Sequence, residues 1–400
     1  MHRPRPVALS LAVRLLAALV GVAGCSSAPG PAREAGHGSA QAAGPVVRAT
    51  VADGLAVPWG VAVLPGGDLL VSERDTARIV RVAAAVATGG SGGSGGSVAA
   101  GAAGATGGAG GTKTEVGLVP GVTAGGEGGL LGLALSPSFE DDHLVYAYLS
   151  TAEDNRIARF TYDSARPSGS RLGIPSVLLS GIPRGPRHNG GRIAFGPDGL
   201  LYAATGDGGT ADIAQDKGSL GGKVLRLTAD GAPAPGNPFP GSPVYSYGHR
   251  NVQGLAWDAE SRLWACEFGA DTWDELNLIR PGGNYGWPVV EGIGHRPGYL
   301  DPVAQWKPAE ASPSGLAYAD GALWMAALRG TRLWRVPVEG DHLAGSPQPY
   351  LEGAYGRLRT VVADRDGTLL LATGNTDGRG DPRPGDDRVL RLTLPGPTAG

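Results

Sequence analysis

The 400-residue sequence predicts an all-β fold, a six-bladed β-propeller of four-stranded antiparallel blades. The first observation is a content of 69 Gly and 32 Pro residues, about a quarter of the chain, which argues against long helices and coiled coils. The second is that 42% of the residues are hydrophobic and eight are Trp, so most of the chain is expected to fold. The third is an internal repeat with the strand content of a propeller blade.

Each repeat opens with a strand of small and apolar residues that ends in a turn. The six opening strands are Trp59–Leu64, Gly132–Ser136, Arg192–Phe195, Gly254–Asp258, Gly315–Tyr318 and Thr360–Ala363. A second apolar strand follows, and a third closes the repeat, in most cases on a basic residue, as in Leu333–Val336. A stack of β-sandwich domains is the alternative, but the even repeats and the lack of a second linker favour a propeller, which leaves only short protected edges.

The N-terminus resembles a lipoprotein signal peptide over residues 1–24. Arginines precede an apolar stretch, Leu15–Ala23, that is too short to span a bilayer. The string Val22-Ala23-Gly24-Cys25 resembles a lipobox, so we expect lipidation at Cys25, with an ordinary secretory signal as the alternative. The protein is then exported and held by a lipid anchor at the outer face of the cell membrane, or is periplasmic or secreted.

Two stretches are predicted to lie outside the packed fold. Residues 25–45 are small and polar and are expected to form a flexible tether, and residues 84–112 form a Gly/Ser-rich insert that is expected to be disordered. Matching strand patterns lie on both sides of the insert, so residues 46–395 are predicted to form one propeller domain.

The charge balance excludes one class of partner. With 34 basic and 37 acidic residues the net charge is −3, so we expect no nucleic-acid partner. Nearly all of the basic residues are Arg, which suits fixed recognition of carboxylates better than Lys does.

Polar clusters lie beside the opening strands, where a propeller brings loops together at one end of its axis. His188, in the string 187–192, is a candidate general base, with a solvated His as the alternative. The string 247–254 is dense in hydrogen-bonding groups before an apolar strand, and a polar turn is the alternative.

Two further clusters carry charge. The acidic residues of 266–277 and the turns of 282–288 suit Ca²⁺, which takes six to eight oxygen ligands, but an ordinary acidic loop fits equally. Arg329 is isolated, whereas Arg357 and Arg359 are two positions apart, so in an extended segment they face the same side and repel unless an anion lies between them. A solvated face is the alternative.

Taken in order, several strings resemble the glucose/sorbosone dehydrogenase family, whose members are six-bladed propeller aldose dehydrogenases that use pyrroloquinoline quinone (PQQ) and Ca²⁺. The matching strings are 129–134, 188–192, 198–202, 205–207, 222–226, 248–251, 253–256, 274–279 and 284–288. They extend over most of the chain from about Val51 to Leu392.

The resemblance implies roles for individual residues. His188 matches the base that removes the proton from the sugar C1 hydroxyl, and Arg250 and Asn251 match residues on the quinone side of the cofactor. The positions that match cofactor carboxylate ligands, or lie next to the cofactor, are Glu127, Arg329, Arg357 and Arg359. The positions that match Ca²⁺ ligands are Gly269 and Ala270 at the cofactor ion, and Glu275 and Tyr285 at a structural ion.

Three positions differ from well-known members of the family. Ala270 stands where they have Pro, Glu127 where they have Gln, and Arg187 where some have an acidic residue. An arginine beside His188 disfavours the protonated imidazole if the two are close.

The leading hypothesis is an exported PQQ- and calcium-dependent aldose sugar dehydrogenase. It oxidises the C1 hydroxyl of an aldose to the lactone and passes two electrons to an external acceptor. A calcium-dependent propeller lactonase is the first alternative, because it needs a metal-bound water but no convergent arginines. A non-catalytic surface propeller that binds carbohydrate or protein is the second, because it needs neither His188 nor the arginines.

Overall fold

The computed structural model describes residues 44–84 and 111–395. The predicted signal peptide, Cys25, nearly all of the tether and most of the 84–112 insert lie outside these residues. None of the helices described is long and apolar enough to cross a membrane.

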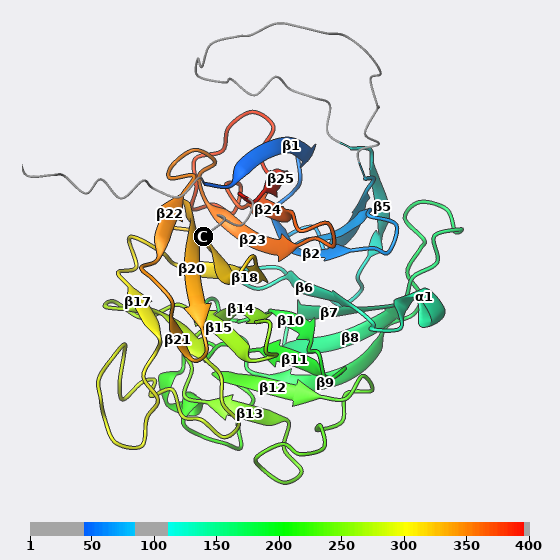
Figure 1. Ribbon diagram of the computed structural model, residues 1–400. Helices are drawn as coiled ribbons and strands as arrows, with labels where there is room; N and C mark the ends of the chain where they lie inside the picture. Colours follow the sequence, from blue (N-terminus) through cyan, green and yellow to red (C-terminus); the bar gives the residue numbers. More distant parts are fainter. Residues whose placement is uncertain (1–43, 85–110, 396–400) are drawn as a thin grey trace, which may run out of the picture. The chain divides into compact units, whose positions relative to one another are not determined.

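The described residues form six antiparallel sheets, which are the blades of a propeller (Figure 1). Blade 1 contains β2 (Pro58–Val63), β3 (Leu69–Glu73), β4 (Arg78–Val82) and β5 (Lys113–Leu118). Blade 2 contains β6 (Leu130–Leu135), β7 (Leu144–Ser150), β8 (Asn155–Thr161) and β9 (Ser176–Ile182). Blade 3 contains β10 (Ile193–Phe195), β11 (Leu201–Ala204), β12 (Lys223–Leu227) and β13 (Val244–Tyr247).

The remaining blades come from the second half of the chain and its N-terminal strand. Blade 4 contains β14 (Val252–Trp257), β15 (Leu263–Glu267), β16 (Asp274–Leu278) and β17 (Ala304–Trp306). Blade 5 contains β18 (Pro313–Ala319), β19 (Ala322–Ala327), β20 (Arg332–Glu339), β21 (His342–Leu343) and β22 (Gln348–Tyr350). Blade 6 contains β23 (Leu358–Ala363), β24 (Leu369–Thr373), β25 (Val389–Thr393) and β1 (Val46–Ala52). Two short helices, α1 (Phe139–Asp142) and a 3₁₀ turn (Ala211–Ala214), lie between strands.

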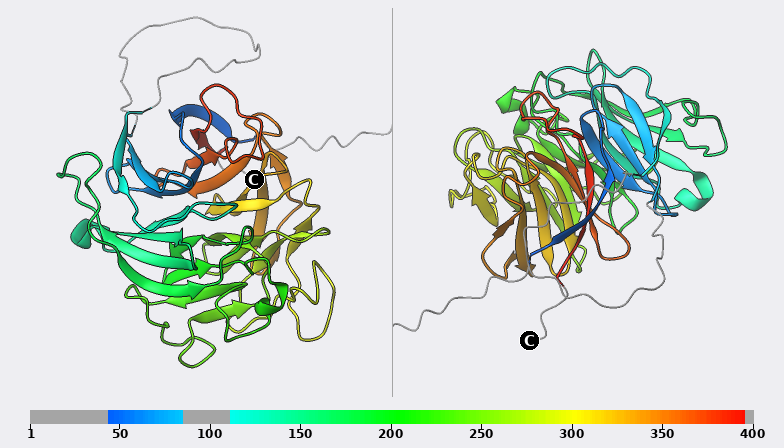
Figure 2. Two further views of the ribbon diagram at one scale, coloured as in Figure 1. Left: turned by 180° about the vertical axis from the view of Figure 1, so that it is seen from behind. Right: turned by 90° about the horizontal axis from the view of Figure 1, so that it is seen from above.

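The ring is closed by strands from the two ends of the described chain. β1 pairs antiparallel with β25, with Val46 opposite Thr393 and Ala52 opposite Val389. The first strand of each blade lies innermost, where β2 contacts β6 and β23, β6 contacts β10, and β18 contacts β14 and β23. The same ring is seen from behind in Figure 2.

Hydrophobic side chains fill the spaces between neighbouring blades. Trp264 of blade 4 and Met325 of blade 5, for example, belong to one buried cluster, and both are fully buried. The small residues of the inner strands allow this close packing of sheet against sheet, because a propeller has least room near its axis.

The six predicted opening strands correspond to the inner strands β2, β6, β10, β14, β18 and β23, so the predicted six-bladed propeller is confirmed. The outer strands and the pairing of β1 with β25 are additional features.

Candidate functional site

His188 lies in the loop that leads into β10, and the loop has a constrained backbone. Its own φ is +59°, in the left-handed region that non-glycine residues rarely adopt. Its backbone N–H donates to Oε2 of Glu127 at 2.8 Å, and its carbonyl accepts from the N–H of Gly208 at 3.0 Å. At Gly190, with φ +61°, a Cβ would lie 2.6 Å from a backbone carbonyl oxygen. The loop therefore holds His188 in one conformation.

The imidazole of His188 is paired with a buried carboxylate. Its Nδ1 lies 2.7 Å from Oδ1 of Asp207, a residue that is 1% exposed. The Asp207 carboxylate also accepts from the N–H of Gly209 at 2.7 Å and from the indole Nε1 of Trp287 at 2.9 Å.

These contacts favour the ionised form of Asp207. Burial alone would raise the pKa of Asp207, but the hydrogen bonds from His188, Gly209 and Trp287 lower it below its usual value. An ionised carboxylate only accepts hydrogen bonds, so Nδ1 of His188 is the donor to Asp207 and Nε2 is the nitrogen available for proton transfer. No described residue hydrogen-bonds to Nε2, so the imidazole is suited to act as a general base.

Arg250 packs over Trp287, with its guanidinium 5.4 Å from the centre of the indole ring. Its backbone N–H donates to Glu267 at 2.8 Å, and its Nη1 donates to the carbonyl of Phe268 at 3.3 Å. Its Nε is buried and has no hydrogen-bond partner. Burial lowers the pKa of this guanidinium, so Arg250 is a desolvated cation with an unused donor.

Asn251 immediately precedes β14. Its side-chain oxygen accepts from the N–H of Gly190 at 2.9 Å, so it ties blade 4 to the loop of His188. Like His188 and Arg250, it is not among the residues that line the adjacent cavity of about 310 Å³.

A cavity of about 310 Å³ opens next to this loop at one end of the propeller axis. The residues around it are Trp59, Arg74, Gly126, Glu127, Gln253, Phe268, Ser312, Leu328, Arg329, Arg357, Arg359, Asp377 and Arg379. All four predicted cofactor residues other than Asn251 are among them. The lining contains five arginines and two carboxylates, an excess of three positive charges, although Arg74 is also paired with Asp75 outside the lining.

Arg357 and Arg359 share one carboxylate that the sequence did not reveal. Asp377 lies 2.8 Å from Arg357 and 3.3 Å from Arg359. Arg359 is 5% exposed and also donates to Gln253 at 3.0 Å, yet its Nε is buried without a partner. Asp377 therefore offsets part of the repulsion between the two guanidiniums, but one buried donor remains unused.

Glu127 bridges the cavity and the histidine loop. One of its oxygens pairs with Arg379 at 2.8 Å and the other accepts from the backbone of His188. Although burial opposes ionisation, these contacts lower the pKa of Glu127, so its negative charge is locally balanced.

Arg329 also lines the cavity and makes no hydrogen bond or ion pair with any described residue.

The loop of Gly269 and Ala270 is wrapped around Glu291. One oxygen of that carboxylate accepts the four consecutive backbone N–H groups of residues 270–273 at 2.7–3.2 Å. These bonds lower the pKa of Glu291 against the effect of burial. The carbonyl oxygens of Gly269 and Ala270 accept no hydrogen bond from any described residue, so they are available to a cation.

Glu275 and Tyr285 border a second, very small cavity of about 10 Å³, enough for one water molecule or ion. Burial and the neighbouring charge of Glu267 raise the pKa of Glu275 to about 8. Asn277 donates to both glutamates, and its own Oδ1 is buried without a partner. The Tyr285 hydroxyl donates to a backbone carbonyl at 2.6 Å, which leaves its main-chain oxygen as the candidate ligand. Within the described ranges, no three His, Cys, Asp or Glu side chains are grouped as a metal site.

Comparison with known proteins identifies the family. The sequence model of the family described as glucose/sorbosone dehydrogenase matches residues 55–381. The chain belongs to this family. The family predicted from the sequence strings, and with it an oxidoreductase, is therefore confirmed.

Individual relatives of this chain are also named as sugar dehydrogenases. The solved structure of the PQQ-bound form of an aldose sugar dehydrogenase from Streptomyces coelicolor is 59% identical, with a TM-score of 0.81, over 88% of this chain and 98% of that one. An aldose sugar dehydrogenase of Escherichia coli is 31% identical over 65% of this chain and 78% of its own length. Quinoprotein glucose dehydrogenase B of Acinetobacter calcoaceticus is 37% identical over 44% of this chain and 43% of its own length. These names favour the dehydrogenase over the lactonase and the non-catalytic propeller.

Sequence reasoning missed the acidic and aromatic partners of the site: Asp207, Trp287, Asp377 and Glu291. Asp207 and Trp287 belong to matching strings, 205–207 and 284–288, so they could have been singled out, although only the fold places them beside His188. Neither Asp377 nor Glu291 belongs to a matching string.

Proposed function

We propose that this protein is a PQQ- and calcium-dependent aldose sugar dehydrogenase that oxidises the C1 hydroxyl of an aldose to the lactone. The observation that carries the proposal is the His188–Asp207 pair beside a cavity with excess positive charge. The PQQ-bound aldose sugar dehydrogenase among its relatives supports the cofactor.

The residues present fit a small planar tricarboxylate. The cavity lining carries an excess of three positive charges, and the side chains available to carboxylates are those of Arg329, Arg357 and Arg359. The buried and unpartnered Nε atoms of Arg250 and Arg359 are donors that lack an acceptor. For Ca²⁺, the fit lies in the free carbonyls of Gly269 and Ala270 and, at a second ion, in Glu275 and the main chain of Tyr285.

The residues of the chain supply acid–base chemistry and orientation. Nε2 of His188 takes the proton of the C1 hydroxyl, while Asp207 holds the ring and stabilises its positive charge. Arg250 places a cation where negative charge develops on the oxidant. When bound, PQQ supplies the carbon that accepts a hydride from C1, and Ca²⁺ beside it acts as a Lewis acid. The two electrons then leave to an external acceptor.

The test is reconstitution of the purified full-length protein with PQQ and Ca²⁺, followed by dye reduction with a panel of aldoses. We expect sugar-dependent reduction that His188→Ala abolishes, with His342→Ala as the matched control because His342 is an exposed residue of the short outer strand β21. Absence of PQQ binding and of activity with every aldose would contradict the proposal. Lactone hydrolysis without PQQ would support the lactonase instead, and sugar binding without turnover a non-catalytic propeller.

Export and lipid anchoring at Cys25 are a separate part of the proposal, supported by the sequence of residues 1–25 alone. We expect the protein in the membrane fraction, and Cys25→Ala to release it from that fraction while purified propeller activity stays unchanged. Recovery of the unaltered protein only in soluble fractions would contradict the anchor and favour an ordinary secretory signal.

A further inference from the structure

At one level of the propeller the inner strands approach one another unusually closely. A Cβ added to any of four glycines would lie 2.3–2.7 Å from backbone atoms of the next blade. These glycines are Gly60 in β2, Gly132 in β6, Gly254 in β14 and Gly315 in β18. The two blades without such a glycine carry Arg192, just before β10, and Thr360, in β23.

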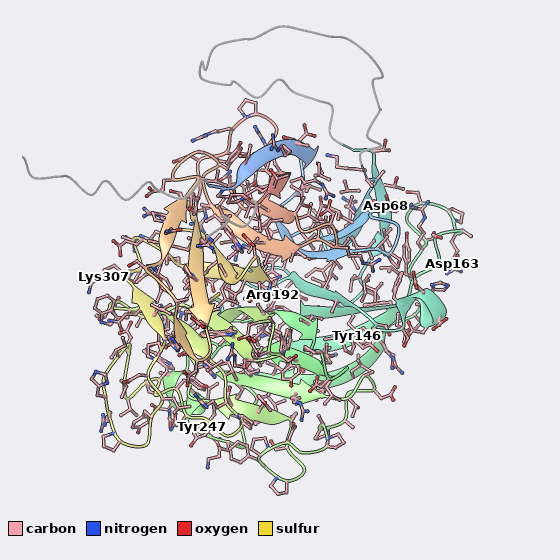
Figure 3. All side chains as sticks on the ribbon, viewed as in Figure 1. Asp68, Tyr146, Asp163, Arg192, Tyr247 and Lys307 are labelled. Atoms are coloured by element: carbon pink, nitrogen blue, oxygen red, sulfur yellow. The ribbon has the colours of Figure 1, made fainter. Side chains whose placement is uncertain are left out.

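Arg192 crosses the axis at this level. Its Nε donates to the carbonyl of Gln253 at 2.9 Å, and its Nη2 donates to Oγ1 of Thr360 at 3.0 Å. Its guanidinium also stacks 4.4 Å from the centre of the Trp59 ring. One side chain from blade 3 thus contacts blades 4, 6 and 1, and blade 6 lies opposite blade 3 in a six-membered ring. Figure 3 shows Arg192 near the centre of the ring.

The charge on this side chain has no counterion. Arg192 is 9% exposed and forms no ion pair with any described residue, since its partners are a carbonyl, a hydroxyl and an aromatic face. A second cation, the guanidinium of Arg359, lies 6.0 Å from the centre of the Trp59 ring. An uncompensated buried cation is costly, and a nearby anion offsets that cost.

Arg192 also lies between two cavities. Trp59 and Gln253, which it contacts, line the 310 Å³ cavity of the candidate site. Arg192 itself lines a larger cavity of about 720 Å³, formed by the other ends of the inner strands. The stacked Arg192 and Trp59 side chains therefore form the floor of the candidate site.

We propose that Arg192 is a positioning residue for the cofactor: it closes the floor of the site, fixes Trp59 and Gln253, and contributes a buried positive charge that an anionic cofactor offsets. This inference rests on the proposed function. It assigns Arg192 no contact with sugar or cofactor.

The test compares cofactor affinity with stability in the full-length chain. Arg192→Met removes the charge and keeps the length, whereas Arg192→Lys keeps the charge and loses the forked donor. Arg365→Met, at the rim of the larger cavity, is the control. Binding of PQQ in the presence of Ca²⁺ is followed by quenching of Trp fluorescence, and Tm is measured with and without PQQ.

We expect Arg192→Met to raise the Kd for PQQ about tenfold, equivalent to about 1.4 kcal/mol, and to reduce the rise in Tm that PQQ produces. Arg192→Lys recovers part of the affinity, and Arg365→Met matches the unaltered protein. A purely structural role would lower Tm equally with and without PQQ and leave Kd unchanged, which would overturn the inference.

If Arg192→Met does not fold, the Kd for PQQ is measured on Thr360→Val instead. This variant removes only one hydrogen-bond partner of the Arg192 guanidinium. A rise in Kd of a few fold supports the inference, and an unchanged Kd overturns it. If the unaltered protein does not bind PQQ, both the proposed function and this inference are contradicted. If the unaltered protein and Arg192→Met bind PQQ equally well, only the inference about Arg192 is contradicted.

Discussion

The two ends of the inner strands differ sharply in chemistry although the same repeat builds both. At the ends where these strands finish, the chain turns through ordinary loops such as that of Gly199, where a Cβ would meet nothing within 4 Å. At the ends where they begin, the backbone is crowded and buried polar groups converge, as at His188 and Arg359. The residues common to the repeats therefore build the ring of blades. The residues that differ from one repeat to the next build the candidate site.

The largest effect on activity is expected from the His188–Asp207 pair, which lies at the end where the inner strands begin. Asp207→Asn keeps the shape of the carboxylate but loses its charge, so it no longer stabilises the imidazolium of His188. We expect kcat to fall by about 10²–10⁴-fold, measured as sugar-dependent dye reduction with saturating PQQ. Asp198→Asn, in the turn after β10, is the control with unchanged kcat. Equal losses in both variants would show that the two ends do not differ in function.

Glycine substitutions compare the stability of the crowded inner strands with that of the open loops at their far ends. Gly132→Ala places a Cβ 2.3 Å from the carbonyl of Gly191 in the next blade, and we expect a loss of about 3 kcal/mol. Gly199→Ala meets no atom, so only its φ of +72° is unfavourable, and about 1 kcal/mol is expected. Denaturant unfolding of the two variants measures both losses, and similar values would contradict the crowding argument.

Chelation tests the metal positions. If Ca²⁺ is held at Glu275, chelation removes the ion that offsets the buried negative charges of Glu267 and Glu275, so Tm should fall by several degrees, roughly 1–2 kcal/mol. Glu275→Gln should abolish this sensitivity to chelator. An unaltered protein whose Tm is the same with and without chelator would exclude a stabilising ion at this position.

The smallest effect is expected from acid titration of Asp377. Its pKa is lowered because the charges of Arg359 and Arg357 outweigh the effect of burial. A lowered folded-state pKa contributes stability that is present above the unfolded value and is lost as pH falls through the folded value. The difference in the free energy of unfolding between the unaltered protein and Asp377→Asn should therefore be largest near neutral pH and shrink below about pH 4. A difference independent of pH would contradict an ionised Asp377.

The inner strands could be predicted from the sequence because each repeats one pattern, as in Gly254–Trp257 and Gly315–Tyr318. The outer strands were less visible. β9 (Ser176–Ile182) is largely exposed, so burial imposes no strong pattern on it. The pairing of β1 with β25 joins residues more than 300 positions apart, which no local pattern indicates.

The site divides in the same way. His188 and the arginines of the cavity stand in recognisable strings, so they were predicted to lie near one another. Asp377 was missed because its role depends on two guanidiniums brought to it by folding. The hydrogen bond from the backbone N–H of Gly190 to the side chain of Asn251 was also missed, because it joins two blades and no local pattern indicates it.

The pairing of β1 with β25 has a consequence for how the chain is made. Blade 6 lacks its outer strand until β25 meets β1, so the ring can close only after all six blades have been synthesised. A partly made chain presents open strand edges, which favour aggregation. Deletion of residues 46–52 would leave such an edge permanently on β25.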